Sequence, residues 1–230
     1  MSDRGGYGQF CPVSMASEVL CTRWTTLVVR ELLCGSTRFN DIRRGVPRMS
    51  PALLSKRLKQ LERAGVISVA RDRSGGSQYT LTEAGEEMRP IILGMGAWGQ
   101  RWVESQLTLK NLDPSLLMWD MRRNLNPKPL PPRRCTIQFL YPELPDKQRN
   151  WWLVVDGPTV DLCGFDPGFE IDLLVRGSLR SMTAVWMGLA LLRQEVDAGR
   201  LELDGDPKIA AAMQSWLGLS GFAPEPRRVA

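Results

Sequence analysis

The sequence of 230 residues contains no histidine. Without imidazole, the Ser-His-Asp and Cys-His nucleophilic mechanisms and His-ligated metal sites are excluded. The five cysteines (11, 21, 34, 135 and 163) are an odd number without a CxxC pair, so they predict neither a disulfide framework nor a metal site. No paired acid and base stands out among the other residues. We therefore expect a protein that is not an enzyme, with no catalytic residue, metal or cofactor.

Long apolar runs are also absent. No stretch approaches the roughly 18–20 unbroken apolar residues that a membrane-spanning helix needs. The opening residues, MSDRGGYGQF, lack the hydrophobic core of a signal peptide. We therefore expect a cytoplasmic protein that does not associate with membranes. Hydrophobic residues still make up 43% of the chain, which is enough for one large core or two ordinary ones.

Positive charge is concentrated in the first half of the chain. Residues 1–110 contain sixteen Lys and Arg against ten Asp and Glu, whereas residues 111–230 contain fourteen against fifteen. Within residues 38–73 the counts are ten and three. This imbalance favours a nucleic acid as the partner of the first half and a different partner for the second.

Residues 50–64 have the pattern of a helix that fits a groove of DNA. Ser50 is a good N-cap, and Pro51 suits the first helical position. One apolar stripe at helical spacing contains Leu54, Leu58 and Leu61. The other side, where small and basic residues suit close approach to bases and phosphates, carries Ala52, Lys56, Lys59 and Arg63, with Ser55 at its edge. The alternative is a surface helix whose basic side is only solvated.

The flanking segments favour the DNA-binding interpretation. Helices are predicted from Pro12 to Leu20, over Thr22–Cys34 and over Arg38–Arg44, and a tight turn then joins the last of these to the Ser50 helix. This is the helix-turn-helix arrangement. Strands over 66–71 and 78–81 enclose a two-glycine turn and predict the hairpin, or wing, of a winged helix. Together these segments predict a DNA contact surface that contains Arg38, Arg43, Arg44, Ser50, Ala52, Ser55, Lys56, Lys59, Arg63, Arg71 and Arg73.

The first half resembles the HxlR-type winged-helix transcriptional regulators. The resemblance is carried, in order, by Cys11-Pro12, Arg23-Trp24-Thr25, Arg30-Glu31-Leu32, Ser50-Pro51, Leu54 to Leu58, Tyr79 to Gly85, and Trp98-Gly99. It implies a dimeric protein that binds double-stranded DNA at its own or neighbouring promoters.

After the wing, Thr82 is expected to cap a helix that begins at Glu83, and Pro90 must kink or restart it. Beyond Pro90, an apolar stripe of Ile91, Ile92, Met95, Trp98 and Trp102 is too large for this small domain to bury. We expect this stripe and the first helix to form a homodimer interface. The alternative is that the second domain covers the stripe.

Cys11 is a candidate redox residue. A thiol at a helix N-terminus feels the positive end of the helix dipole, which lowers its pKa and favours the reactive thiolate. In some members of the HxlR-type family that this half resembles, a cysteine at this place senses oxidants and electrophiles. The alternative is an inert small residue.

The second half is expected to be a sheet with helices on one face, so that the whole chain is α+β. A helix over Leu112–Asn124 and a proline-rich connector over 126–132 precede four strands, over 135–141, 151–155, 159–163 and 171–175. Helical structure follows over 178–198, then a short strand over 201–203 and a last helix over 207–217.

This half is similar to the sterol-carrier-protein lipid-binding domain. The similarity is carried by Trp151 to Val155, Asp161 to Cys163, Ile171 to Leu173, Ser181 to Thr183 and Ala198 to Asp206. It implies an apolar cavity between sheet and helices. Tryptophan and methionine suit such a cavity, and the candidate ligand-binding residues are Trp152, Met182, Trp186, Met187 and Met213. The alternative is that these side chains simply fill the core.

The sequence thus predicts a winged-helix DNA-binding and dimerisation domain at 1–110 and a sterol-carrier-like domain at 111–225. The favoured function is a dimeric, sequence-specific transcriptional regulator that an apolar small molecule in the second domain controls. One alternative is a thiol-based regulator that uses Cys11 as its trigger. A further alternative is a lipid carrier or scaffold.

Overall fold

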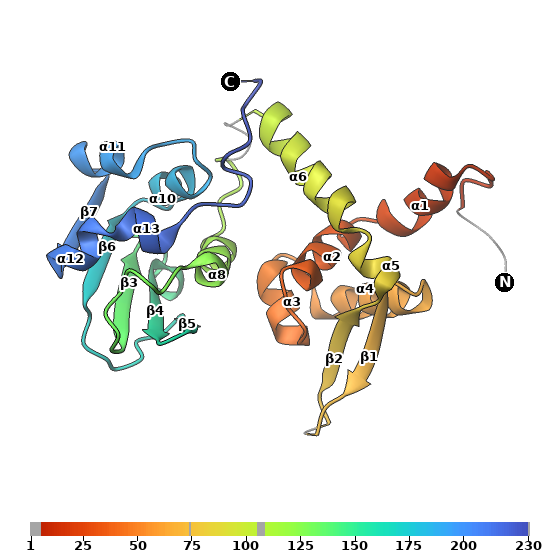
Figure 1. The fold of residues 1–230 in the computed structure, drawn as a ribbon, viewed down its shortest axis with the longest axis horizontal. Helices are drawn as coiled ribbons and strands as arrows, with labels where there is room; N and C mark the ends of the chain where they lie inside the picture. Colours follow the sequence, from red (N-terminus) through yellow and green to blue (C-terminus); the bar gives the residue numbers. More distant parts are fainter. Residues whose placement is uncertain (1–5, 74, 105–108, 230) are drawn as a thin grey trace. The chain divides into compact units, whose positions relative to one another are not determined.

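The computed structural model describes residues 6–73, 75–104 and 109–229 (Figure 1). Internal contacts divide the chain into two compact units, unit 1 (Met1–Gly96) and unit 2 (Ala97–Ala230). The division falls inside helix α6 (Arg89–Trp102), so that one continuous helix contributes to both units. Among the described residues, no helix combines the length and the apolar character that crossing a membrane requires.

Unit 1 has the expected winged helix-turn-helix fold. Its elements are α1 (Pro12–Leu20), α2 (Thr25–Leu33), α3 (Phe39–Gly45), α4 (Pro51–Arg63), β1 (Ile67–Arg71), β2 (Ser77–Leu81), α5 (Glu83–Glu86) and the first part of α6. Helix α2 begins three residues later than predicted. The cause is Trp24, whose φ of 79° is outside the right-handed helical region, so the helix cannot begin before Thr25.

Local sequence explains why α4 forms where it does. The Ser50 side chain accepts a hydrogen bond from the Leu53 backbone N–H at 3.3 Å, and Pro51 occupies the first helical position. The apolar stripe packs into the core of unit 1, with exposed fractions of 2% or less for Leu54, Leu58 and Leu61. Gly65, with a φ of +72°, follows the helix and turns the chain into β1.

The wing is an antiparallel hairpin in which Ile67 pairs with Leu81 and Arg71 with Ser77. The hairpin is joined to the segment before α3, because the Tyr79 N–H donates to the Thr37 carbonyl at 2.8 Å. An isolated antiparallel bridge links Arg38 with Gln78 next to this bond. The wing is therefore anchored directly to the helix-turn-helix. After it, α5 ends before Pro90 and α6 begins at Arg89, the restart that the proline predicts.

Unit 2 contains a five-stranded mixed sheet in the order β5-β4-β3-β6-β7. The strands are β3 (Cys135–Leu140), β4 (Asn150–Asp156), β5 (Thr159–Cys163), β6 (Leu173–Gly177) and β7 (Leu201–Gly205). β3 and β6 are parallel and the other neighbours are antiparallel. β6 lies two residues later than predicted, since Asp172 is held at the sheet margin by a hydrogen bond from its N–H to the Thr136 carbonyl at 2.9 Å.

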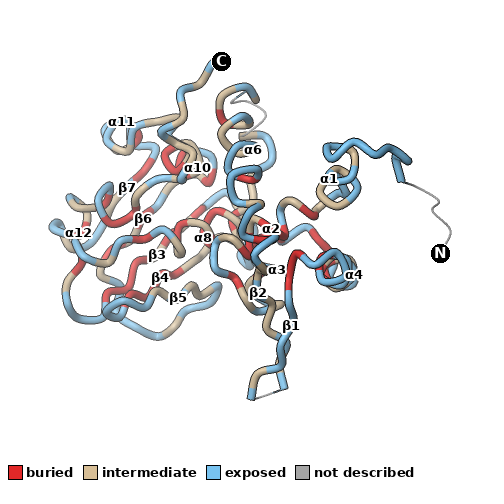
Figure 2. The backbone as a smooth tube through the Cα atoms, turned by 45° about the vertical axis from the view of Figure 1, so that its right-hand side comes forward, coloured by how far each residue is buried: buried red, intermediate tan, exposed pale blue. Residues whose placement is uncertain are grey.

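The helices of unit 2 pack on one face of this sheet. They are α8 (Pro114–Asn124), the single turn α9 (Asp146–Arg149), α10 (Leu179–Trp186), α11 (Leu192–Asp197), α12 (Pro207–Ala211) and α13 (Met213–Leu217). The predicted helix over 178–198 is two helices, separated by a turn at Gly188, whose φ is +71°. The core joins α8, α10 and α13 to the inward side chains of β3, β4 and β6, and Figure 2 shows most of β3 as buried.

The end of α6 is fastened to the C-terminal tail within unit 2. The Arg101 Nε and Nη2 atoms donate to one Glu225 carboxylate oxygen at 2.8 and 2.5 Å. The Arg228 N–H donates to the Arg101 carbonyl at 2.8 Å, and the buried Gln100 side chain donates to the Met187 carbonyl at 3.1 Å. Through these bonds, the last turn of α6 is attached to the C-terminal tail and to the residue that follows α10.

Candidate nucleic-acid interface

The outer side of α4 is a basic, solvent-exposed surface. Ala52, Lys56, Lys59 and Arg63 are all exposed, and Ser55 is half-buried at the edge, as the helical pattern predicts. Lys56, Lys59 and Arg63 form no ion pair with any described residue. Because the leucines on the other side of the helix fix its rotation, these three cations are held away from the core. They are therefore available to phosphates.

Further cations lie beside the turn of the helix-turn-helix and on the wing. Arg43 and Arg44 are exposed in the last turn of α3, where Arg44 makes an ion pair with Asp41 at 3.4 Å. Arg71 and Arg73 are exposed near the tip of the hairpin. Ser50 is also exposed, and its hydroxyl is used as the cap of α4.

Arg38 differs from the other predicted contacts. Its guanidinium makes an ion pair with Asp72 in the wing, and the same carboxylate accepts a hydrogen bond from the Gly76 N–H at 2.8 Å. The side chain is therefore engaged in holding the wing against the segment before α3. The sequence did not indicate this pairing because Arg38 and Asp72 are 34 positions apart.

A buried ion pair that the pattern did not single out fixes α2 against α3. Glu31 is fully buried, and Arg30 Nη2 donates both to its carboxylate and to the Gly45 carbonyl, each at 2.8 Å. An added methyl group at Gly45 would lie 1.8 Å from the Glu31 carboxyl carbon. Gly45, the last residue of α3, is therefore required by close packing, and this contact sets how α3 leads into α4.

Cys11 lies just before α1 and is exposed to solvent. The backbone N–H groups of Ser14 and Val13, in the first helical turn, lower the pKa of its thiol. Cys21 and Cys34 are exposed as well. Cys135 differs, because burial and the neighbouring Asp172 carboxylate raise the pKa of its thiol to about 12.

The predicted dimer stripe is largely exposed on α6. Ile91, Met95, Trp98 and Trp102 have exposed fractions of 48–61%. Ile92 does not belong to this surface: it is 7% exposed and packs into the core of unit 1. The first helix is also open, since α1 has no buried residue (Figure 2) and Val13 and Met15 are exposed.

The predicted ligand-binding residues of unit 2 do not share one surface. Met182, Trp186 and Met213 are buried in the core, and Met187 packs partly against it. Trp152 is buried on the opposite face of the sheet, because the side chains of β4 alternate and Trp151 is the one packed against the core. The expectation that Trp152 faces the space between sheet and helices is therefore wrong.

Two hollows of unit 2 have polar walls instead. The larger, of about 470 Å³, is lined by Arg133, Arg134, Thr136, Phe169, Glu170 and Asp172. The other, of about 270 Å³, lies beside Arg176, Ser178 and Arg200. Neither contains any of the five predicted ligand-binding residues. In the described part of the chain, no cluster of Cys, Asp and Glu could hold a metal ion.

Comparison with known proteins relates part of the chain to a family. A family model described as HxlR-like helix-turn-helix matches residues 19–107. The chain is 35% identical to the HTH-type transcriptional regulator YvaP of Bacillus subtilis over 99 residues, which are 42% of this chain and 92% of that protein. It is 32% identical to the HTH-type transcriptional regulator YodB of the same organism over 97 residues, 41% of this chain and 87% of that protein. The reduced form of YodB aligns with a TM-score of 0.37 at 29% identity, covering 42% of this chain and 98% of that one. The family match ends at residue 107 and does not describe the remainder of unit 2.

Proposed function

Because this chain belongs to the HxlR-like helix-turn-helix family, whose matched relatives are transcriptional regulators, we propose that it is a transcriptional regulator that binds double-stranded DNA as a homodimer. The observation that carries the proposal is the row of unpaired cations on α4, directed away from the core by the buried leucine stripe. Arg43, Arg44, Arg71 and Arg73 extend this positive surface to the turn and the wing. α4 would enter the major groove, and the wing would contact the backbone or minor groove.

Removing two of the cations tests this proposal. Lys56→Ala together with Lys59→Ala should weaken binding to every duplex sequence and reduce the slope of log K against log salt concentration by roughly two. Fluorescence anisotropy with a labelled duplex over a salt series measures both quantities. Lys110→Ala with Lys128→Ala is the matched control, because both lysines are exposed and outside the helix-turn-helix. An unchanged salt slope in the α4 variant would contradict the assignment.

The exposed stripe on α6 supports dimerisation. Four large apolar side chains at positions 91, 95, 98 and 102 follow helical spacing and remain open to solvent in the single chain. An apolar surface of this kind typically marks an interaction site. We expect the partner to be a second copy of the chain, because a DNA site with two-fold symmetry is bound by a protein with the same symmetry.

For unit 2 we propose a sterol-carrier-like domain that controls DNA binding through an apolar small molecule. The mixed sheet with helices on one face and a core rich in methionine and tryptophan support this role. A coupling free energy of about 1–3 kcal/mol between the two sites would change DNA affinity roughly 5–150-fold.

Native mass spectrometry of the protein purified from its host tests the role of unit 2. A retained apolar molecule supports ligand control. An empty protein that also extracts no lipid from phosphatidylcholine vesicles contradicts both ligand control and the lipid-carrier alternative.

A second candidate is thiol-based regulation through Cys11, which its exposure and lowered thiol pKa favour. Iodoacetamide at neutral pH should modify Cys11 faster than the exposed Cys21 and Cys34, because the thiolate is the nucleophile. Peptide mass spectrometry over time measures the three rates in one sample. Cys11→Ser should then abolish any release of DNA caused by diamide. Unchanged release from this variant would rule the mechanism out.

A further inference from the structure

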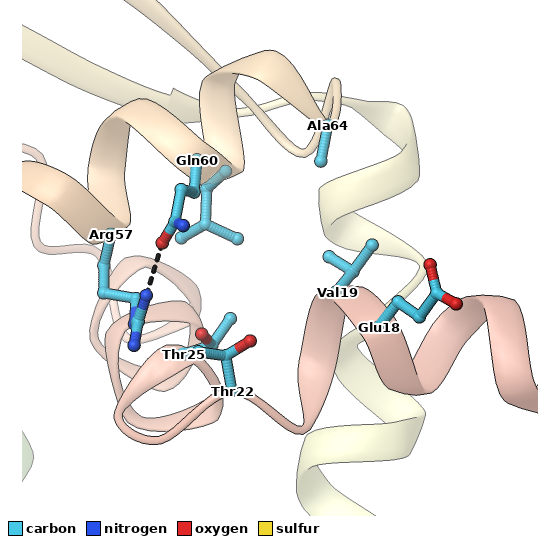
Figure 3. A pocket seen from close by; sticks show the side chains of 8 residues that line it. Glu18, Val19, Thr22, Thr25, Arg57, Gln60 and Ala64 are labelled. Carbon is cyan, nitrogen blue, oxygen red and sulfur yellow. Dashed lines mark hydrogen bonds between the residues drawn. The ribbon is translucent and has the colours of Figure 1, made fainter. Parts of the chain in front are cut away.

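A small pocket of unit 1 lies where α1, α2 and α4 meet, with a volume of about 140 Å³. α4 contributes Arg57, Gln60 and Leu61, the start of α2 contributes Thr25, the preceding turn Thr22, and α1 contributes Val19 (Figure 3). Liquid water occupies about 30 Å³ per molecule, so the pocket has room for a ligand of the size of roughly four to five waters. The residues lie on the inner side of the same helix that presents Lys56 and Lys59.

Thr25 is the feature that points to a ligand. This residue is 3% exposed, yet its hydroxyl has no hydrogen-bond partner among the described residues. Its backbone N–H donates to the Thr22 carbonyl at 3.0 Å, and Figure 3 shows both threonine hydroxyls on the same side of the hollow. The hydroxyl is not one of the fully buried unpaired side-chain atoms of the described residues, because it borders the pocket and water can reach it there. A polar ligand atom in the pocket would replace this water as the hydrogen-bond partner of the Thr25 hydroxyl.

The charges around the pocket favour an anion. Arg57 donates from Nε to the Arg23 carbonyl at 3.0 Å and from Nη1 to the Gln60 side chain, which leaves its Nη2 group without a described partner. Helix α2 starts at Thr25, which lines the pocket, and has no side-chain cap, so the positive end of its dipole lies at this pocket.

The acidic residue at the pocket, Glu18, is turned away from the proposed position of the anion. The Glu18 carboxylate accepts a hydrogen bond from the Tyr7 N–H at 2.9 Å. Figure 3 shows this carboxylate directed away from the two threonine hydroxyls. Beside Gln60, the remaining lining side chains are the hydrocarbon groups of Val19, Leu61 and Ala64. The pocket therefore combines one anion-binding side with one apolar side.

We propose that this pocket binds a small aliphatic monocarboxylate, with its carboxylate at Arg57 and Thr25 and its hydrocarbon part against Val19 and Leu61. Binding would join α1 and α2 to α4. An effect of the ligand on DNA affinity rests on the proposed function, because it requires that α4 contact DNA. The binding of the carboxylate itself does not depend on that function.

Titration of the ¹⁵N-labelled full-length protein with sodium butyrate, at constant ionic strength and without DNA, tests the site. We expect saturable amide shifts over residues 19–25 and 57–64. Thr25→Val preserves the shape but removes the hydroxyl, and it should weaken butyrate binding roughly tenfold, as expected for a hydrogen bond to a charged group. Thr26→Val is the matched control, since Thr26 is the next residue of α2 but does not line the pocket.

Sodium phosphate and 1-butanol separate the two halves of the proposed ligand. An affinity for butyrate well above the affinities for phosphate and for 1-butanol supports the proposal. Equal binding of phosphate would overturn the apolar part, and equal binding of butanol would overturn the anionic part. Thermal unfolding checks that Thr25→Val folds, and Thr22→Val provides the same test at a more exposed hydroxyl. Absence of saturable shifts, or unchanged affinity in both variants, would overturn the site even if the α4 lysines prove to bind DNA.

Discussion

At the scale of single residues, the geometry of the helix-turn-helix depends on a glycine and a buried carboxylate. Glu31 reaches under the end of α3 and leaves no room for a side chain at Gly45, while Arg30 bonds to both residues. A buried carboxylate is tolerated because this arginine neutralises it. The contact orients α3, and through the following turn it orients α4.

Gly45→Ala should therefore destabilise the protein. Overpacking against the Glu31 carboxylate costs about 1–3 kcal/mol, which exceeds the roughly 0.5–1 kcal/mol that alanine gains over glycine in a helix. Urea unfolding followed by circular dichroism measures the difference. Gly94→Ala in α6 is the control, because an added methyl group there meets nothing within 4 Å, and it should leave stability unchanged or raise it. Equal stability of both variants would refute the packing argument.

At the scale of elements, α6 takes part in both units. Its first part contributes Ile92 to the core of unit 1, and its last turn is bonded to the C-terminal tail of unit 2. The tail also meets α10, since the Ser220 N–H donates to the Trp186 carbonyl at 2.8 Å. A change in the core of unit 2 that moves this tail would therefore reach the helix that carries the apolar stripe.

Glu225→Ala should loosen the end of α6. The substitution removes an ion pair in which two Arg101 nitrogens donate to one carboxylate oxygen. The pair is partly shielded from solvent, and its contribution to the local stability is about 1 kcal/mol. Amide hydrogen exchange at residues 100–103 should become about three to ten times faster, with exchange in α4 unchanged as the internal reference. Arg228→Ala, in the same tail but without a described side-chain bond, is the control and should leave exchange at residues 100–103 as in the wild type.

At the scale of the whole molecule, the proposed homodimer would cover the exposed stripe of α6. Trp98 lies in the middle of this stripe with 61% of its surface exposed. Tryptophan side chains are frequent anchors of protein interfaces because they bury a large area with few rotamers.

Trp98→Glu should convert a dimer into a monomer at micromolar concentration, which sedimentation velocity would show. DNA affinity should fall as well, since one recognition helix reads only one half-site. Leu93→Glu is the matched control: it is 51% exposed on the same helix but lies on the side away from Trp98 and should remain dimeric. A wild-type protein that sediments as a monomer would contradict the dimer proposal.

Local signals in the sequence were enough to specify the elements of unit 1 and the side of α4 that faces solvent. Caps, proline positions and the change from helical to strand periodicity each act within a few residues. For the same reason the exposure of the basic residues on α4 and the wing follows from local periodicity alone. Most of the order of elements in unit 2 also followed from local pattern. The single turn α9 was not predicted, and the helices predicted over 178–198 and 207–217 are each two helices.

Contacts between distant residues depended instead on how the elements pack in three dimensions. Packing paired Arg38 with Asp72, buried Ile92 in the core, and turned Trp151 rather than Trp152 toward the helices. Alternation along a strand shows that two neighbouring residues face opposite ways, but the side that is covered depends on where the helices lie. Likewise the unpaired Thr25 hydroxyl becomes visible only when three helices enclose it, because burial is a property of distant neighbours and not of the local sequence.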